Sequence, residues 1–158
     1  MNDKAAGIPY EFTFDTIEVG QTSSSPGRTI TEMDINLYMM LTGGWHPVHC
    51  DKEFMRQNGL GSVRAQGSLG IALSLGSHLE SSVLVSSEKF VKALGVDQWS
   101  YEKPLVAGDT IHLEVQVAEK KLLEDGKRYI ITRRVRIVNQ DGIVIQEGLA
   151  SSMWERSL

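Results

Sequence analysis

Two Asp-Gly pairs, Asp125-Gly126 and Asp141-Gly142, constrain the fold of this chain more than any other feature. Each pair lies between strand-like runs that are rich in Val, Ile and Thr or alternate in polarity. Asp-Gly favours tight hairpin turns, because glycine adopts the positive φ angles that such turns require. The second half of the chain is therefore predicted to form an antiparallel meander. We expect its strands at residues 99–105, 110–122, 128–139 and 143–154.

The first half of the chain carries helical signals. Thr31 is followed three residues later by Asp34, a pattern that resembles a capping box at a helix start. Asp51 can cap a short second helix that ends near Gly59, and residues 66–82 predict a longer one. That long helix contains Gly67, and glycines inside a helix cost up to about 1 kcal/mol each relative to alanine. We therefore expect it to pack closely against a sheet.

Three shorter stretches complete this prediction. Residues 10–17 are expected to form an edge strand, and residues 23–27 a loop between early strands. Residues 42–50 contain two glycines and Pro47, so they are expected to form a loop that interrupts the helices. Within it, Cys50 is expected to be a small buried residue. The order of strand, helices and meander predicts an α+β fold in which one long helix lies on a curled antiparallel sheet.

Composition narrows the class of protein. With 158 residues, 41% of them apolar and 23% charged, the chain is expected to form one soluble globular domain over residues 1–158. No apolar stretch is long enough for a membrane span, and residues 1–8 lack the apolar core of a signal peptide. A net charge of −4 argues against nucleic acid as the main partner. The single cysteine fits a reducing compartment, so we expect a cytoplasmic protein.

Four short motifs, in the right order and spacing, resemble the MaoC-like enoyl-CoA hydratases. In that family a run Ser/Thr-Gly-Asp-x-Asn-Pro-aliphatic-His precedes a His/Gln-Gly start to the central helix. The family then has an aromatic-x-Lys-Pro-x-x-x-Gly-Asp strand entry and a final hairpin. The corresponding segments here are residues 41–49, Gln66-Gly67, residues 101–110 and residues 139–142. This resemblance implies a hot-dog fold, in which a curved antiparallel sheet wraps around a central helix, and a homodimer or a dimer of dimers.

The resemblance also implies a chemistry. The family interconverts trans-2-enoyl-CoA and (R)-3-hydroxyacyl-CoA, with no cofactor and no metal. His49 occupies the position of the family's catalytic histidine, and the backbone amide of Gly67 would bind the thioester oxygen at a helix N-terminus. The residues expected to contact the acyl-CoA thioester substrate are Gly43, Trp45, Gln66 and Ser68. Leu37, Met40 and Leu73 would either belong to the core or line the acyl pocket.

Two positions depart from the family pattern. Gly44 stands where the family has its catalytic Asp, and His46 stands where it has Asn. Three interpretations remain open. His46 and His49 together could bind the water as acid and base; a nearby carboxylate (Asp51, Glu32 or Asp34) could replace the missing one; or the protein could bind acyl-CoA and catalyse little.

Other site types are disfavoured by the sequence. His46 and His49 supply only two ligands, whereas zinc generally needs three or four, so no metal is expected. A hot-dog acyl-CoA thioesterase is the alternative enzyme. That chemistry usually needs a carboxylate on the central helix, and Glu80 is the only acidic residue in 66–82.

Overall fold

The computed structural model describes residues 10–76 and 84–157. Its main sheet has the strand order β2-β6-β7-β8-β5, and β3 also pairs with β6. These strands are β2 (Thr22–Ser24), β3 (Arg28–Thr29), β5 (Lys89–Tyr101), β6 (Thr110–Leu122), β7 (Arg128–Val138) and β8 (Val144–Glu155). A separate parallel pair joins β1 (Tyr10–Phe12) to β4 (Leu84–Ser86). The helices are α1 (Glu32–Thr42), α2 (Pro47–Cys50), α3 (Lys52–Gln57) and α4 (Gly67–Leu75).

The predicted meander is confirmed for its last three strands, whereas the first predicted strand, which overlaps β5, pairs with β8 and not with β6. β6, β7 and β8 pair antiparallel in sequence order, and the two turns between them contain Gly126 (φ 65°) and Gly142 (φ 73°). The side chain of Asp125 accepts hydrogen bonds from the backbone amides of Lys127 and Arg128 and from the Arg128 guanidinium. These bonds, the one from the guanidinium first, lower the pKa of Asp125 to about 2.

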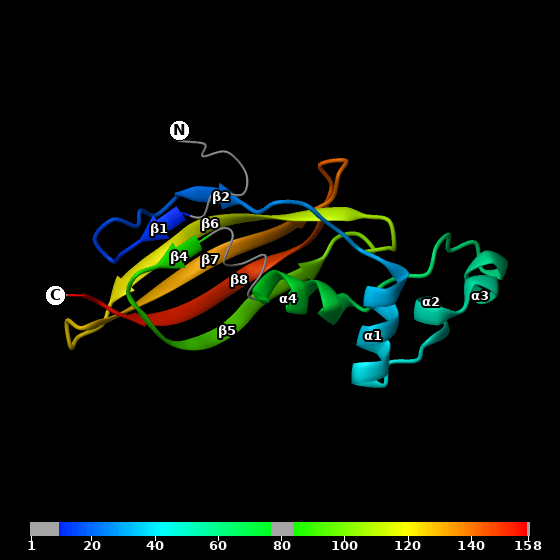
Figure 1. Ribbon diagram of the computed structural model, residues 1–158, viewed down its shortest axis with the longest axis horizontal. Helices are drawn as coiled ribbons and strands as arrows, with labels where there is room; N and C mark the ends of the chain where they lie inside the picture. Colours follow the sequence, from blue (N-terminus) through cyan, green and yellow to red (C-terminus); the bar gives the residue numbers. More distant parts are fainter. Residues whose placement is uncertain (1–9, 77–83, 158) are drawn as a thin grey trace.

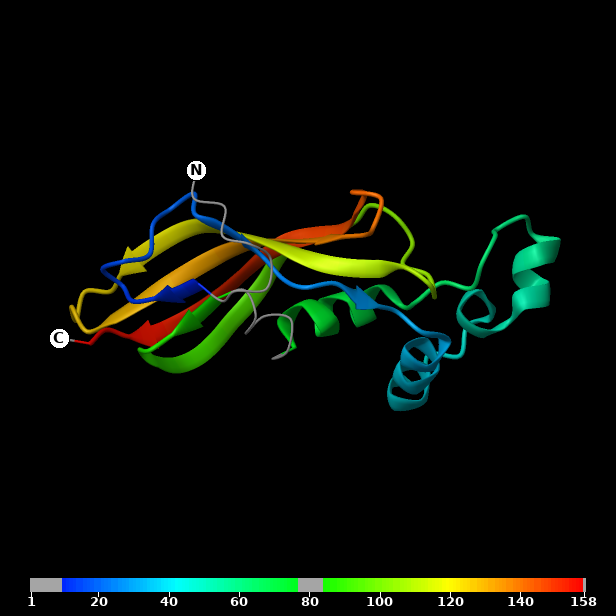
Figure 2. The same cartoon turned by 45° about the horizontal axis from the view of Figure 1, so that its top comes forward.

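The core lies between the inner face of this sheet and the helices. Side chains on β6 and β7 alternate between buried and accessible, as expected for strands with one covered face. The inward set, which includes Leu113 and Ile137, packs with Leu69 of α4 and Met39 of α1. Figure 2 shows the twisted sheet curving over α4. The predicted α+β architecture, an antiparallel sheet curved around a helix, is therefore confirmed.

The three short helices form an extension beyond one end of the sheet, which we call the overhang (residues 32–57; Figure 1). The predicted capping box is present: Asp34 N–H donates to Thr31 Oγ1, and Thr31 N–H donates to Asp34 Oδ2. α1 buries Ile35 and Met39, while a second apolar stripe stays exposed. That stripe comprises Met33, Leu37, Met40 and Leu41, so of the two alternatives for Leu37 and Met40 a place in the core is excluded.

Several boundaries differ from the prediction. The predicted loop at residues 23–27 is shorter, because residues 22–24 form β2 and pair with residues 114–116 of β6. Pro47–Cys50 form the short helix α2, since proline is well suited to a first helical turn. α4 ends at Leu75, so Gly76 is not inside it. The rest of the predicted helix, including Glu80, lies outside the described residues. Cys50 is exposed, not buried, because α2 turns that position outward.

β5 begins at Lys89, ten residues before the predicted strand start at Trp99. Among the described residues its only strand partner is β8, and three register shifts interrupt that pairing. At the last of them Gln98 adopts a φ of 52°, a bulge conformation that re-aims the next side chain. Most of the strand is exposed, including Phe90, Val91, Leu94 and Val96.

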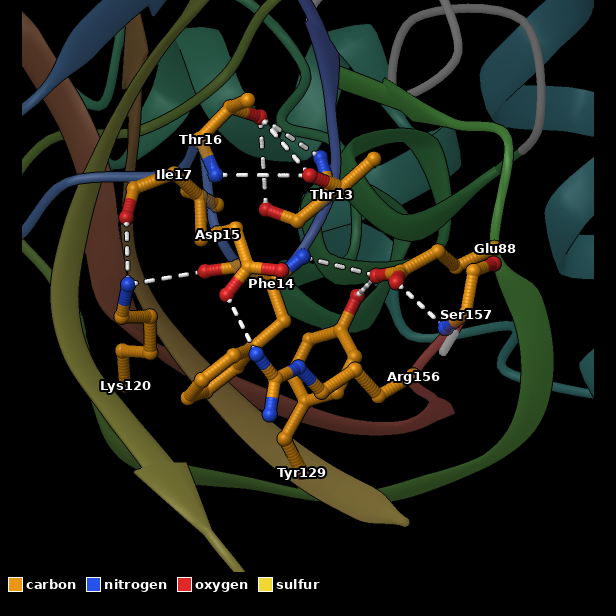
Figure 3. A network of polar contacts seen from close by, with 10 residues as sticks. All are labelled: Thr13, Phe14, Asp15, Thr16, Ile17, Glu88, Lys120, Tyr129, Arg156 and Ser157. Atoms are coloured by element: carbon orange, nitrogen blue, oxygen red, sulfur yellow. Dashed lines mark hydrogen bonds and ion pairs between the residues drawn. The ribbon is translucent and has the colours of Figure 1, made fainter. Parts of the chain in front are cut away.

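At the opposite end of the sheet from the overhang, a polar network ties the two chain ends together (Figure 3). The buried carboxylate of Glu88 accepts hydrogen bonds from Phe14 N–H, Ser157 N–H and the hydroxyl of Tyr129. Burial raises the pKa of Tyr129 above its ordinary value, and the hydrogen bond to Glu88 and its charge raise it further. Arg156 adds an ion pair of 2.7 Å to Asp15.

Candidate active site

The overhang and α4 meet at the side chain of Gln66, the residue before the first turn of α4. Its Oε1 accepts a hydrogen bond from Thr42 Oγ1 (2.9 Å), and its Nε2 donates to the carbonyl oxygen of Gly44 (2.9 Å). A second connection runs from Arg64 N–H to the carbonyl of Val48 (2.9 Å). The loop after α1 and the start of α4 are therefore held side by side, although 22 residues separate Gly44 from Gln66.

The carbonyl group of Arg64 selects one tautomer of the neutral His49 ring. Its Nδ1 lies 2.7 Å from the carbonyl oxygen of Arg64. A carbonyl only accepts hydrogen bonds, so the neutral imidazole carries its proton on Nδ1. This leaves a lone pair on Nε2, and the ring is partly buried. His49 is therefore oriented as a hydrogen-bond acceptor and base.

His46 has the opposite pattern. It is the N-cap residue of α2, and its Nδ1 accepts a hydrogen bond from Val48 N–H (3.3 Å). An amide N–H only donates, so the neutral ring carries its proton on Nε2. The centroids of the His46 and His49 rings are 6.2 Å apart. The loop thus carries one imidazole with an Nε2 proton and one with an Nε2 lone pair.

The N-terminus of α4 provides two free amides. Within the described chain, the N–H groups of Gly67 and Ser68 have no hydrogen-bond partner, and Gln66 gives no side-chain cap. The ring of Tyr101 lies against Gly67: a Cβ built on Gly67 would be 2.6 Å from Tyr101 Cε1. Glycine at this position therefore lets an aromatic ring lie directly beside the helix start.

Residues of the sheet also contact the N-terminus of α4. Gln146 on β8 donates from Nε2 to the carbonyl of Gly67 (3.1 Å) and accepts from Trp99 Nε1–H (3.0 Å). A Cβ on Gly70 would overlap the Gln146 amide, and a Cβ on Gly148 would overlap the Trp99 ring. The expectation that glycines of this helix serve close packing is confirmed at Gly70.

The predicted site residues are only partly brought together. His46, His49, Gln66 and Gly67 lie on the joined segments described above. Gly43 ends α1 with a φ of 70°, and no atom lies within 4 Å of a Cβ built there. The side chains of Trp45 and Ser68 are exposed to solvent, and that of Trp45 is 58% exposed.

The nearby carboxylates differ in what they do. Asp51 caps α3 by accepting a hydrogen bond from Phe54 N–H. Asp34 is partly buried, which raises its pKa, but hydrogen bonds from Thr31 and Arg28 outweigh that effect and lower it overall. Glu32 pairs with Lys52 (2.7 Å) and shares with His49 a small pocket of about 110 Å³. Of the three candidates, Glu32 is the carboxylate that shares a pocket with the histidine.

Sequence reasoning missed Thr42, Tyr101, Trp99 and Gln146 as residues that shape this site. Tyr101 opens the Tyr101-x-Lys103-Pro104 motif, so a signal for it was present. Nothing in the sequence marks Gln146, because its role depends on strands and a helix that are distant along the chain. Among the described residues no cluster of three or more His, Cys, Asp or Glu side chains could hold a metal ion. None of their helices has the length and apolar character to cross a membrane.

This fold, an antiparallel sheet curved around a central helix, is that of a hot-dog protein. Residues 15–139 match the MaoC like domain model, and the chain belongs to this family of hot-dog hydratases and dehydratases. Protein MaoC of Klebsiella aerogenes is 25% identical over 112 residues, which are 71% of this chain. The chain spans about a third (32%) of the length of that curated relative.

Two solved structures are similar to this chain over most of its length. The monoamine oxidase regulatory protein of Archaeoglobus fulgidus is 26% identical with a TM-score of 0.82, covering 96% of this chain and 99% of that one. An (R)-hydratase of Pseudomonas aeruginosa, in its unliganded form, is 26% identical with a TM-score of 0.73. That alignment covers 92% of this chain and 86% of the hydratase.

Proposed function

We propose that this protein is an acyl-CoA hydratase or dehydratase that interconverts trans-2-enoyl-CoA and (R)-3-hydroxyacyl-CoA. The observation that carries the proposal is the pair of opposite tautomers, His49 with a free Nε2 lone pair and His46 with an Nε2 proton. Hydration requires one group that takes a proton and one that gives a proton. The pair supplies both without a carboxylate at residue 44.

In the hydration direction, His49 Nε2 takes a proton from water as the water oxygen bonds to the β-carbon. The electron pair of the C=C bond moves towards the thioester carbonyl and forms an enolate. His46 then gives its Nε2 proton to the α-carbon, and the carbonyl reforms. One water is consumed, and the two histidines regain their starting protonation by exchanging one proton through solvent.

The free amides of Gly67 and Ser68 would stabilise the negative charge on the thioester oxygen. They lie at the N-terminus of α4, where the helix dipole favours an anion. Donors of this kind act mainly on the transition state, because the charge on the oxygen grows during the reaction. The exposed apolar stripe of α1 and Trp45, on the same overhang as the histidines, would provide an apolar surface for the acyl chain.

We further propose that the chain is one domain over residues 1–158, acts in the cytoplasm, and pairs as a homodimer through β5. The edge of β5 away from β8, which no described strand pairs, is long, and the strand carries exposed apolar side chains, a surface that proteins usually cover. The one cysteine, which is exposed and unpaired, supports a reducing compartment.

The first experiment mixes the purified protein with crotonyl-CoA, following loss of the enoyl absorbance and release of free thiol in parallel. Loss of absorbance without thiol is the expected result. Thiol release would instead identify a thioesterase. If neither signal changes with short or longer acyl chains while binding is detectable, the protein is an acyl-thioester-binding protein and the hydratase proposal is wrong.

His49→Ala is expected to abolish turnover while leaving the thermal unfolding temperature close to that of the wild type. His112→Ala is the matched control, because His112 lies on β6 and its Nε2 is 3.7 Å from Glu114, outside the site. Equal turnover in the two variants would remove His49 from the mechanism.

A further inference from the structure

Gln146 is a buried polar side chain with no part in the proton transfers described above. It is only 2% exposed and lies under the first turns of α4. Its orientation is fully determined by its two partners. The indole N–H of Trp99 only donates, so it selects Oε1; the Gly67 carbonyl only accepts, so it selects Nε2.

The Gly67 carbonyl and the Ser68 N–H belong to the same planar peptide unit. A hydrogen bond to the carbonyl end therefore fixes the plane of this peptide and polarises its N–H. The N–H itself has no partner within the described chain. The Gln146 amide thus binds the carbonyl oxygen of a peptide unit whose N–H group is free to donate.

Trp99 and two glycines make this arrangement possible. The bulge at Gln98 precedes Trp99, which packs against the core. Gly148 and Gly70 provide the space that the indole and the Gln146 amide occupy. The orientation of one peptide at the helix start is therefore built from β5, β8 and α4 together.

We propose that Gln146, held by Trp99, is a positioning residue that aims and polarises the Ser68 N–H toward the thioester oxygen. This inference rests on the proposed function, because it assigns a role to an amide of the same site. Gln146 touches no substrate. Its effect is expected on the step in which charge develops on that oxygen.

The test compares Gln146→Met with the wild type. Methionine has a similar length but cannot bond the Gly67 carbonyl. Losing a well-aimed oxyanion donor costs about 10²–10³-fold, so misaiming one is expected to lower kcat roughly tenfold with little change in KM. Gln140→Met is the matched control, since Gln140 bonds Thr110 N–H at an exposed turn and should leave both constants unchanged.

A second measurement does not depend on activity. Loss of the bond to the Gly67 carbonyl should move the amide nitrogen resonance of Ser68 upfield in the NMR spectrum of Gln146→Met but not of Gln140→Met. If Gln146→Met fails to fold, the double variant Trp99→Phe with Gln146→Met replaces it, because no indole N–H is then left unpaired.

The outcomes are distinguishable. Wild-type kcat in a folded Gln146→Met, or an unmoved Ser68 resonance, would overturn the positioning role while leaving the hydratase intact. If the wild type converts no enoyl thioester, the proposed function fails and, with it, the assignment of a thioester oxygen as the target of this amide. A lower kcat together with a moved resonance supports the role.

Discussion

The side-chain amide of Gln66 occupies the space beside Gly44 that any side chain at residue 44 would need. A Cβ built on Gly44 would overlap Gln66 Nε2, the same atom that donates to the Gly44 carbonyl. The observed position of the Gln66 side chain thus requires a glycine at residue 44, because a larger residue there would displace it. The position at which the family resemblance expects a carboxylate is already filled by another part of the chain.

Gly44→Asp alone is therefore expected to give no increase in turnover. The new side chain must displace Gln66 from Thr42 and from Gly44, which should cost about 1–3 kcal/mol of unfolding free energy. Adding Gln66→Ala frees the space, and a carboxylate able to act as acid or base should then raise kcat at least about tenfold over Gly44→Asp. Steady-state rates and denaturant unfolding of all four proteins in the cycle would measure this coupling. Higher activity from Gly44→Asp alone would contradict it.

His46→Asn separates the two roles of His46. Asparagine is a good N-cap, so the bond to Val48 N–H is retained and stability should change by less than about 0.5 kcal/mol. It has no titratable proton to give, so kcat should fall by about 10²-fold or more. His46→Ala, which loses both the cap and the acid, is the comparison. Near-wild-type turnover of His46→Asn would mean that His46 only caps α2.

Tyr129→Phe tests the polar network in Figure 3. It removes one of three donors to Glu88, so unfolding free energy at pH 7 should fall by about 1–3 kcal/mol. The pKa of Tyr129 is raised in the folded protein. Its contribution is therefore fully present below about pH 10, the ordinary tyrosine value, and is lost as pH rises through the folded-state pKa.

Denaturant unfolding at pH 7 and at pH 10.5–11 checks this linkage. The difference in stability between wild type and Tyr129→Phe should shrink at the higher pH. A difference that is constant or grows with pH would show that the Tyr129 proton is not linked to folding.

Leu94→Lys tests the proposed pairing of β5 edges. Leu94 is 40% exposed in the single chain, so lysine should be tolerated there, but a charge on a paired edge should weaken the dimer strongly. Ile143→Lys is the control, because Ile143 is 43% exposed and lies in the β7–β8 turn. Sedimentation should show a monomer for Leu94→Lys and a dimer for Ile143→Lys. A wild-type monomer would contradict the pairing itself.

The parts of the fold that the sequence predicts are those specified by local rules. The Asp-Gly turns locate β6, β7 and β8 because a tight turn needs only neighbouring residues. The capping box at Thr31 and the cap at Asp51 are likewise local. β5 is different: three register shifts break its period of two, so residues 89–98 show no alternation to detect.

For the candidate site, the sequence identifies candidate residues but does not determine their hydrogen-bond partners. The motif spacing identifies His46, His49 and Gln66-Gly67 as candidates. The tautomer of His49 depends on the Arg64 carbonyl, 15 residues away, which no pattern in the sequence specifies. The solvent-facing stripe of α1 has the spacing of a buried face, so apolar spacing alone could not decide between a core position and an exposed one for Leu37 and Met40.

The glycines around α4 also set how this sequence can change over evolutionary time. Each one leaves the volume that a specific neighbouring side chain fills, so enlarging the glycine requires a smaller neighbour in the same lineage. Single substitutions at these positions are then disfavoured, while compensating double substitutions can persist. Aligned relatives should show correlated replacement at three pairs of positions: Gly67 with Tyr101, Gly70 with Gln146, and Gly148 with Trp99.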